Sequence, residues 1–481
     1  MAMKSSGGTL SAGNTRGGSG TGLGYADLKA QGVDLDAVVA DYVASNGAAG
    51  IRCVASGLNR MDIPADHFDT VENIAAMEAA KSAIFAQQAD HAVAYEDSLS
   101  AARKRRNLRE KNPGWGASKE VALAMRISPK GGTQFVNSSR TMGADLPLTR
   151  QGLRDGKVTW AQAQIVISGT RNLELANRQL VDRLLWEETH NCFEQGTAKL
   201  ADIVAYWAKI LEPKTEEDLE AKAWKNRCIG GYQINAHEVM ISGTLPLSLG
   251  IAVLQVLARE AEKAQREPGE ERSAGQIQAD AFYELMTGLK VAGGVPLEIL
   301  LVMDAAVLTG ESNEPVLIPG YGFISANRAR KMVAAGPDDE LAIWVRGLFV
   351  ESRTGQLVAM ESRARRFGGN LKKLIKVRDQ YCRTPYCNGK IRDIDHVVQV
   401  RKNGKTTEDN SSGRCFSCNQ TKEAPDWDEH PTPGDRHSFI ITTPSSHTYI
   451  SKAPPLPGMK TGLHRSNISE DGLPGTGPPG G

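Results

Sequence analysis

Four cysteines near the C-terminal end of the chain have a spacing that suits a metal ion. Cys382 and Cys387 form one close pair, and Cys415 and Cys418 form a second. Two such pairs, each near a turn, can place four thiolates tetrahedrally around zinc, and a site filled by four protein ligands is closed and therefore structural. Free core thiols or two disulfides are the alternatives. The chain has seven cysteines, an odd number, and no leader-like apolar segment, which disfavours a disulfide framework.

Polar residues with catalytic potential lie between these pairs and just after them. Residues 391–398 alternate between apolar and polar, which predicts a strand that carries Asp395 and His396 to its end. An unperturbed histidine titrates near neutrality, so it can take a proton from water. Asn410 and Asn419 follow. Separately these would be a surface pair, a turn residue and a helix cap; what discriminates is their joint spacing with the four cysteines, which matches the family pattern described next.

This order of residues resembles the HNH nuclease family. The family pattern is a cysteine pair, Asp-His, a central Asn, and then Cys-x-x-Cys with Asn or His directly behind it and a basic residue close by. The chain supplies this pattern from Cys382 to Lys422. Where the family name implies a final His, this chain has Asn419, which the family tolerates. Asp393 stands where relatives vary; it would either support the metal ligands or face solvent, and the second interpretation is favoured slightly.

The resemblance implies roles for the matched residues and a ββα-metal arrangement. His396 would be the general base, and Asn410 would tether the loop that orients it. Asp395 and Asn419 would hold one divalent cation, expected to be Mg²⁺, with oxygen ligands. That cation would stabilise negative charge on the phosphate and on the leaving oxygen. The zinc would hold together a module too small for a large core.

Basic residues just before the first cysteine pair suggest a surface that contacts phosphates. Between residues 361 and 378 the acid Glu361 stands alone among many cations. The residues predicted to contact nucleic acid are Arg366, Lys372, Lys373, Lys376 and Arg378. A solvated helix face is the alternative. Farther upstream, the run Arg103–Arg106 is expected to be exposed to solvent.

The elements that must position these residues belong to a multidomain chain of 481 residues with a net charge of +1. Any contact with nucleic acid must therefore come from local patches. The expected fold is a mainly α N-terminal region, a small α+β segment and a C-terminal ββα-metal module. The predicted boundaries are a Gly/Ser-rich tail at 1–30, a helical domain at 31–290, a connecting segment at 291–361, the nuclease domain with a trailing hairpin at 362–457, and a tail at 458–481.

Local signals predict several elements within these regions. Thr159 and Gln162 resemble a capping box at the start of a helix. The apolar run Leu297–Met303 predicts a strand, and Ser325 predicts the start of a helix that runs to Val333. Hairpins are predicted around Arg353–Gln356 and over 438–451. Further helices are predicted at 174–189, 198–211, 216–224, 247–264 and 274–288.

A wider resemblance covers most of residues 70–458. Leu371–Trp427 is similar to the C-terminus of a large actinobacterial family that joins a helical domain of unknown function to an HNH nuclease. The segments Thr442–Gly458, Leu148–Val166 and Gly320–Gly322 also fit that family, the last two more loosely. The resemblance implies no mechanism for the helical domain, whose role in the family is unassigned.

These observations predict an endonuclease that hydrolyses phosphodiester bonds of DNA, with structural Zn²⁺ and catalytic Mg²⁺. The alternative is a zinc-stabilised protein that binds nucleic acid without cutting it. An RNA substrate is disfavoured because no aromatic stacking platform is evident near the motif. No apolar run approaches the roughly 20 residues needed to span a bilayer, so a cytoplasmic location without a membrane partner is expected. A homodimer is left open, since cutting both strands with a single-metal site calls for pairing.

Overall fold

The computed structural model describes residues 34–189, 191–212, 216–235, 238–288, 297–334, 343–349, 367, 369–434 and 436–456. Contacts divide the chain into two compact units, residues 1–77 and 78–481. The predicted tails at 1–30 and 458–481 lie outside the described residues, as does the hairpin turn predicted at Arg353–Gln356.

The first unit contains two short helices and the beginning of a long one. They are α2 (Leu35–Asn46), α3 (Ala48–Leu58) and α4 (His67–Arg105), of which α4 continues into the second unit. Asp34 caps α2, because its side chain accepts a hydrogen bond from the amide of Ala37 at 3.1 Å. Gly47 separates α2 from α3 with φ of +50°, a conformation that glycine adopts without steric cost.

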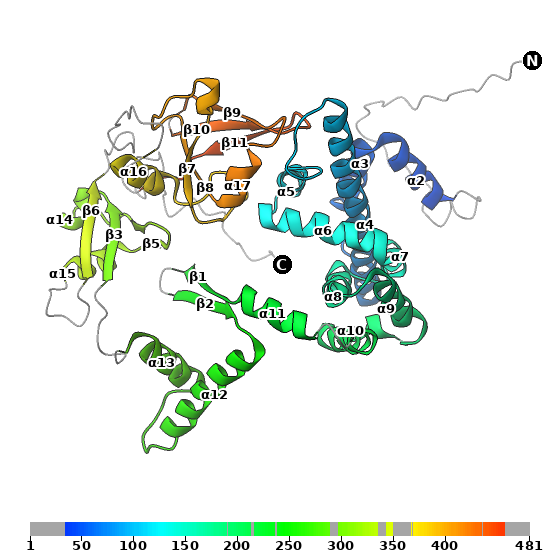
Figure 1. Ribbon diagram of the computed structural model, residues 1–481, viewed down its shortest axis with the longest axis horizontal. Helices are drawn as coiled ribbons and strands as arrows, with labels where there is room; N and C mark the ends of the chain where they lie inside the picture. Colours follow the sequence, from blue (N-terminus) through cyan, green and yellow to red (C-terminus); the bar gives the residue numbers. More distant parts are fainter. Residues whose placement is uncertain are drawn as a thin grey trace, which may run out of the picture. The chain divides into compact units, whose positions relative to one another are not determined.

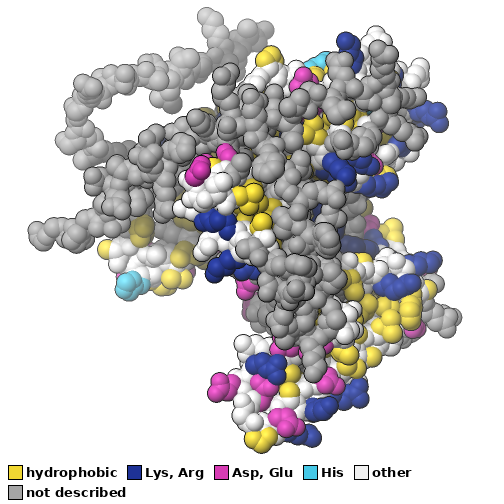
Figure 2. All heavy atoms as spheres, turned by 90° about the vertical axis from the view of Figure 1, so that its left-hand side faces the viewer, with side chains coloured by type: hydrophobic (Ala, Val, Ile, Leu, Met, Phe, Trp, Pro, Cys, Tyr) yellow, Lys and Arg dark blue, Asp and Glu magenta, His cyan; other side chains and the backbone are white. Residues whose placement is uncertain are grey.

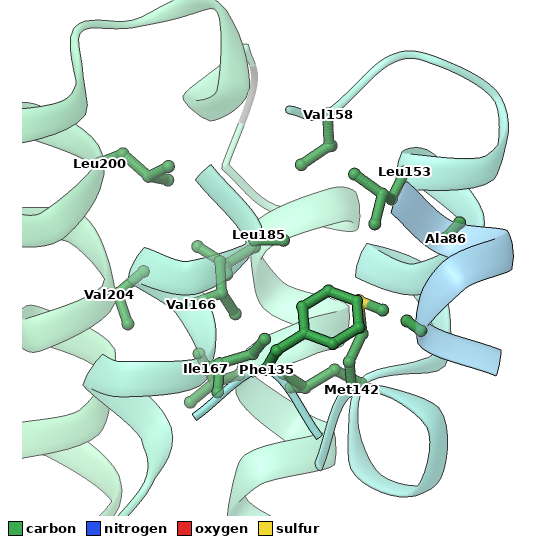
Figure 3. Close-up of a cluster of buried hydrophobic side chains, with 14 of the residues drawn as sticks. Ala86, Phe135, Met142, Leu153, Val158, Val166, Ile167, Leu185, Leu200 and Val204 are labelled. Carbon is green, nitrogen blue, oxygen red and sulfur yellow. The ribbon is translucent and has the colours of Figure 1, made fainter. Parts of the chain in front are cut away.

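The second unit opens with a helical domain built around one apolar core (Figure 1). After α4 come α5 (Ala117–Met125), α6 (Pro129–Asp145), α7 (Pro147–Arg154), α8 (Trp160–Thr170), α9 (Leu175–Glu187), the 3₁₀ turn η1 (Cys192–Glu194) and α10 (Thr197–Leu211). Figure 3 shows Phe135 and Met142 of α6, Leu153 of α7, and Val166 of α8 pointing into the shared interior, where they are buried. Each helix therefore contributes one apolar face to a common core.

The first amides of two of these helices are capped by identified side chains, one local and one distant in the sequence. The predicted capping box at the start of α8 is confirmed: the Thr159 hydroxyl accepts from the amide of Gln162, whose side chain accepts from the amide of Thr159. The first amides of α7 are capped from another helix. Asp182 of α9 accepts from the amides of Leu148 and Thr149 at 2.8 and 3.0 Å, and burial raises the pKa of this carboxyl group.

A helix, a hairpin and a helical pair follow the helical core. They are α11 (Glu216–Asn226), the antiparallel strands β1 (Cys228–Asn235) and β2 (Glu238–Thr244), α12 (Leu247–Ala264) and α13 (Ala274–Thr287). The strands β1 and β2 were not predicted from the sequence. On the face of α12 and α13 seen at the bottom of Figure 2, cationic and acidic side chains are interspersed.

The connecting segment forms a mixed four-stranded sheet with the strand order β5-β4-β3-β6. Its strands are β3 (Leu297–Met303), β4 (Val316–Ile318), β5 (Gly322–Ile324) and β6 (Ile343–Phe349), with β3 parallel to β6 and the other pairs antiparallel. The helix α14 (Ala305–Thr309) lies between β3 and β4 in the chain, and α15 (Ala326–Ala334) lies between β5 and β6. The predicted strand Leu297–Met303 and the helix predicted from Ser325 are confirmed.

The C-terminal module contains a helix, a β-hairpin with a short helix, and a three-stranded sheet. Its elements are α16 (Gly369–Asp379), β7 (Asp393–His396), the 3₁₀ turn η3 (Val400–Lys402), β8 (Ser411–Arg414), α17 (Phe416–Thr421), β9 (Asp428–Thr432), β10 (Ser438–Thr442) and β11 (Thr448–Lys452). β7, β8 and α17 form the predicted ββα unit, and the hairpin predicted over 438–451 is β10–β11. The predicted fold class is confirmed.

Candidate functional site

The four cysteines of the C-terminal module converge on one point. Their Sγ atoms all lie within 4.8 Å of one another. The Sγ atom of Cys387 lies 3.8 Å from that of Cys415 and 3.7 Å from that of Cys418. A tetrahedron of sulfurs placed about 2.3 Å from zinc has edges of about 3.8 Å. The cluster therefore fits a closed zinc site and does not fit two disulfides.

Two turns bring the cysteine pairs together. Cys415 caps α17, since its Sγ accepts from the amide of Cys418. In the loop that carries the other pair, a Cβ at Gly389 would lie 2.9 Å from the Cβ of Cys415 and 3.3 Å from the Sγ of Cys387. Glycine at this position therefore allows the loop to approach the second pair closely.

A cation from the helical domain faces this sulfur cluster. Burial lowers the pKa of Lys119 on α5, and the negative charges of Cys418, Cys415 and Cys387 oppose that shift. The Lys119 ammonium is held by the carbonyl of Pro129 at 2.9 Å. Zinc with four thiolates would carry a net negative charge, which this ammonium group would partly offset.

His396 and Asp395 stand at the end of β7, as predicted. His396 is 6% exposed, and its Nε2 lies 2.9 Å from the hydroxyl of Thr406. On its other side, Nδ1 lies 3.8 Å from the Oδ1 atom of Asp395. The ring of Phe367 packs against the imidazole with centroids 4.5 Å apart. The imidazole is thus held from three directions.

Asp395 is anchored by a lysine to which the sequence analysis gave no role. The Nζ atom of Lys422, whose side chain is 3% exposed, lies 2.7 Å from the Oδ2 atom of Asp395. The same ammonium group donates to the carbonyl oxygen of His396, while Oδ1 of Asp395 accepts from the amide of His396 at 2.9 Å. One cation therefore fixes both residues of the Asp-His pair. The basic position behind the second cysteine pair was the sequence signal for it.

Asn410 ties together the loop between β7 and β8. Its Oδ1 accepts from the amide of Val398 at 2.7 Å, and its Nδ2 donates to the carbonyls of Val398 and Lys405 at 3.0 and 2.8 Å. Its own carbonyl accepts from the amide of Val397. These backbone contacts are the kind that the predicted tethering role requires.

Asn419 lies on α17, which packs against β7. Its Oδ1 atom is buried and has no hydrogen-bond partner within the described part of the chain. A buried amide oxygen without a partner costs about 1–3 kcal/mol, which a divalent cation would relieve. Each oxygen of Asp395 retains a lone pair beside its present contacts. The donors at Asp395 and Asn419 are thus the oxygen ligands that Mg²⁺ prefers.

A cavity of about 900 Å³ opens in front of the Asp-His pair. Its walls include Asp395 and His396, together with Phe367, Lys372, Arg401 and Glu423. The cavity mixes acidic, basic and aromatic side chains beside a histidine, so it can admit a polar substrate to that histidine.

The predicted nucleic-acid contacts divide into three groups. Lys372, Lys373 and Lys376 are exposed on α16, and Lys372 also lines the cavity. Arg366 lies outside the described residues. Arg378 is only 7% exposed, and its guanidinium donates to Asp379 and to the carbonyls of Glu408 and Ser411. The phosphate contact predicted for Arg378 is therefore wrong for this structure, because its donors are used inside the module.

Arg378 belongs to a buried ion cluster that the sequence analysis missed. Asp379 accepts from Arg378 at 2.8 Å, from Arg383 at 2.7 Å, and from the amide of Gly413. Burial alone would raise the pKa of Asp379, but the charges of Arg378 and Arg383 outweigh it and lower that pKa. Arg383 also donates to the carbonyl of Ser451 on β11. The cluster thus fastens the cysteine loop to the ββα unit and to the three-stranded sheet.

Comparison with known families agrees with this geometry. A family model described as HNH endonuclease matches residues 380–424, so the C-terminal module belongs to a class of nucleases, whose substrate is nucleic acid. A second model, described as a domain of unknown function (DUF222), matches residues 78–379, more than half of the chain. The chain belongs to the DUF222 family and carries an HNH endonuclease domain directly behind it.

No curated protein and no solved structure matches the chain. Within the described ranges, no helix is long and apolar enough to cross a membrane.

Proposed function

We propose that this protein is a metal-dependent endonuclease that hydrolyses phosphodiester bonds of DNA. The position of His396 carries the proposal. It lies on the wall of a cavity of about 900 Å³, with Asp395 on one side and Thr406 on the other. A protein that only binds nucleic acid has no need for a fixed base beside a carboxylate.

His396 acts as the general base. When Nε2 carries the ring proton it donates to the Thr406 hydroxyl, and Nδ1 then carries the lone pair. Nδ1 then takes a proton from the attacking water. Lys422 and Asn410 are positioning residues in this scheme, because Lys422 holds Asp395 and the carbonyl of His396, and Asn410 holds the backbone of Val397 and Val398.

Asp395 and Asn419 would hold Mg²⁺, and the four cysteines would hold zinc. Bound Mg²⁺ would stabilise negative charge on the phosphate and on the leaving oxygen. The exposed lysines of α16 would contact DNA phosphates on the approach to the cavity. A cytoplasmic location stays a prediction from the sequence, and so does the homodimer that double-strand cutting would call for.

Plasmid cleavage by the full chain tests this proposal. With Mg²⁺, the wild-type protein should nick or cut supercoiled plasmid, and His396→Ala should not. His430→Ala is the matched control, since His430 is exposed on β9 and does not line the cavity; this variant should cut like the wild type. All three proteins should hold the same amount of zinc.

Two results would contradict the assignment. Equal cleavage by wild type and His396→Ala would remove His396 from the chemistry. A wild-type protein that binds plasmid tightly but leaves it intact with every divalent cation would favour the non-cleaving alternative.

A further inference from the structure

The end of α4 and the loop after it are docked on the nuclease module. Arg103 is 0% exposed, and its Nη1 donates to Glu110 and to the carbonyl of Trp115 at 2.8 and 2.7 Å. Its Nη2 donates to the carbonyl of Pro425 in the nuclease module. The expectation that the whole run Arg103–Arg106 faces solvent is therefore wrong at Arg103. A buried guanidinium of this kind fixes the orientation of the segment that carries it.

Further contacts reinforce this docking. Arg106 binds both carboxylate oxygens of Asp426 at 2.9 and 3.0 Å. The loop continues into Gly116, whose φ is +91° and where an added Cβ would lie 2.7 Å from the Nε1 atom of Trp427. The apolar cluster behind it joins Leu123 and Trp115 of the helical domain to residues of the nuclease module, namely Val397, Ala424, Trp427, Phe439 and Ile441. The segment thus packs against one side of the nuclease module.

The outward face of this segment is cationic. Lys104, Arg105 and Arg109 are exposed, and no ion pair joins any of them to an acid in the described part of the chain. The acid of the segment, Glu110, is turned inward, where it pairs with Arg103 and is 13% exposed. Three unpaired cations within six residues are therefore left for an external anion.

The docking places this segment near one wall of the candidate active site. Pro425 and Asp426, which the segment contacts, follow Glu423 by two and three residues, and Glu423 lines the cavity. Lys111 also donates to Gln420 on α17, the helix that carries Asn419. Duplex DNA carries one negative charge per about 1.7 Å of its axis, so it would meet several of these cations at once.

We propose that residues 104–111 of the helical domain are a second nucleic-acid-binding surface of this protein, presented beside the nuclease cavity by the buried Arg103. Its ligand is the phosphate backbone of the DNA that the nuclease site is proposed to cut, so the inference rests on the proposed function. The surface supplies non-specific affinity and register, because phosphate contacts position a duplex without reading its sequence. This gives part of the helical domain a role in substrate binding.

Salt dependence of DNA binding tests the inference in the full chain. The background is His396→Ala, which keeps DNA intact during the measurement, and the probe is a 30-base-pair duplex. The test variant is Lys104→Glu with Arg105→Glu and Arg109→Glu. If all three cations contact phosphates, the slope of log Kd against log salt falls by about 2.7 in this variant. Between 50 and 200 mM salt, the increase in Kd of the variant is then about 40-fold smaller than that of the background protein.

Two triple variants serve as comparators. Lys372→Glu with Lys373→Glu and Lys376→Glu reverses the predicted DNA contacts of α16. Arg259→Glu with Lys263→Glu and Arg266→Glu reverses exposed cations of α12 and the turn after it, where acids are interspersed (Figure 2). The α12 variant should keep the slope of the background protein. All variants should hold the same zinc, which shows that the module is folded.

The outcomes separate the inference from the proposed function. A reduced slope for both the 104–109 variant and the α16 variant supports both. A reduced slope for the α16 variant alone, with the 104–109 variant equal to the α12 control, overturns the inference and leaves the proposed function standing. Failure of the background protein to bind the duplex overturns both. Unchanged DNA binding with lost binding of a polyglutamate probe would reassign the surface to an acidic protein and overturn the inference.

Discussion

The carboxylate of Asp379 neutralises two buried arginines, and its replacement by asparagine should destabilise the C-terminal module strongly. The side chain of Asp379 is 0% exposed, and those of Arg378 and Arg383 are 8% and 3% exposed. Asp379→Asn keeps the size and one acceptor oxygen but removes the negative charge. Two buried guanidinium groups are then left side by side, and Glu408, whose carboxylate lies 3.4 Å from Arg378, is the acidic partner that remains among the described residues.

The burial of this cluster sets the size of the effect. Breaking a buried ion pair by removing one partner costs about 3–5 kcal/mol, which is about 150- to 5,000-fold in an opening equilibrium at 1.36 kcal/mol per decade. Asp90 offers a matched control, because it also binds two arginines, Arg150 and Arg154, but is 24% exposed. An exposed pair contributes about 0–1 kcal/mol, so Asp90→Asn should change the equilibrium by about fivefold at most.

Hydrogen exchange read by mass spectrometry on the full chain measures this difference. Peptides covering β8 and α17 should lose about two to four decades of protection in Asp379→Asn, or all of it, and little in Asp90→Asn. The pKa of Asp379 is lowered in the folded protein, so its stabilising contribution is complete above about pH 3.9 and is lost only as the pH falls through the lower folded value. The effect should therefore be equal at pH 7 and pH 5.

Similar small losses of protection in Asp379→Asn and Asp90→Asn would refute the reasoning. They would mean that water reaches the cluster and screens its charges. A large loss at pH 7 that vanishes at pH 5 would refute it differently, because it would place the titration of Asp379 above its usual range.

Three further substitutions test other parts of the module. Burial beside Arg378 and Arg383 lowers the pKa of His437 to about 4, so the free energy of unfolding should fall by on the order of 1–3 kcal/mol as the pH drops from about 6.5 toward 4. The urea concentration at the midpoint of zinc release should decline with pH in the wild type and vary less in His437→Gln. Parallel pH profiles for the two proteins would contradict this prediction. Elemental analysis should find about one zinc ion per chain in the wild type and none in Cys415→Ser, whereas Cys228→Ser should keep its zinc. A full zinc content in Cys415→Ser would exclude the four-cysteine site. Thr406→Val should lower kcat for plasmid cleavage about 10- to 100-fold and alter its pH profile, and Thr406→Ser should restore both. Unaltered cleavage by Thr406→Val would show that the contact with Nε2 does not position the imidazole.

The sequence predicted features whose causes lie within a few residues of one another. The spacing of the cysteine pairs, the capping box at Thr159 and the hairpin over 438–451 each depend on local chemistry, and the structure contains all three. The strand β1 was missed because Gly230 and Gly231 interrupt its pattern, and both strands of that hairpin are largely exposed. The two strands therefore lack the alternation of apolar and polar residues by which a half-buried strand is recognised in a sequence.

Features that depend on distant partners could not be predicted in this way. Arg103 stands in a run of four cations, which is typical of a solvated surface, and its partner Pro425 lies 322 residues away. Arg378 resembles its exposed neighbour Lys376 in sequence, yet Ser411 and Glu408 bind it inside the module. For both arginines, the tertiary fold decides between a solvent-facing charge and a structural one.

The ion cluster around Asp379 also bears on how such proteins could exchange parts in evolution. The two family matches meet between Asp379 and Gln380, so a recombination event at that boundary would separate Asp379 from Arg383 and Gly413, its partners on the other side. A chimaera would need a compatible acid at the end of the incoming helix to neutralise the inherited arginine. Successful exchange is therefore expected at junctions upstream of α16, with that helix inherited together with the nuclease.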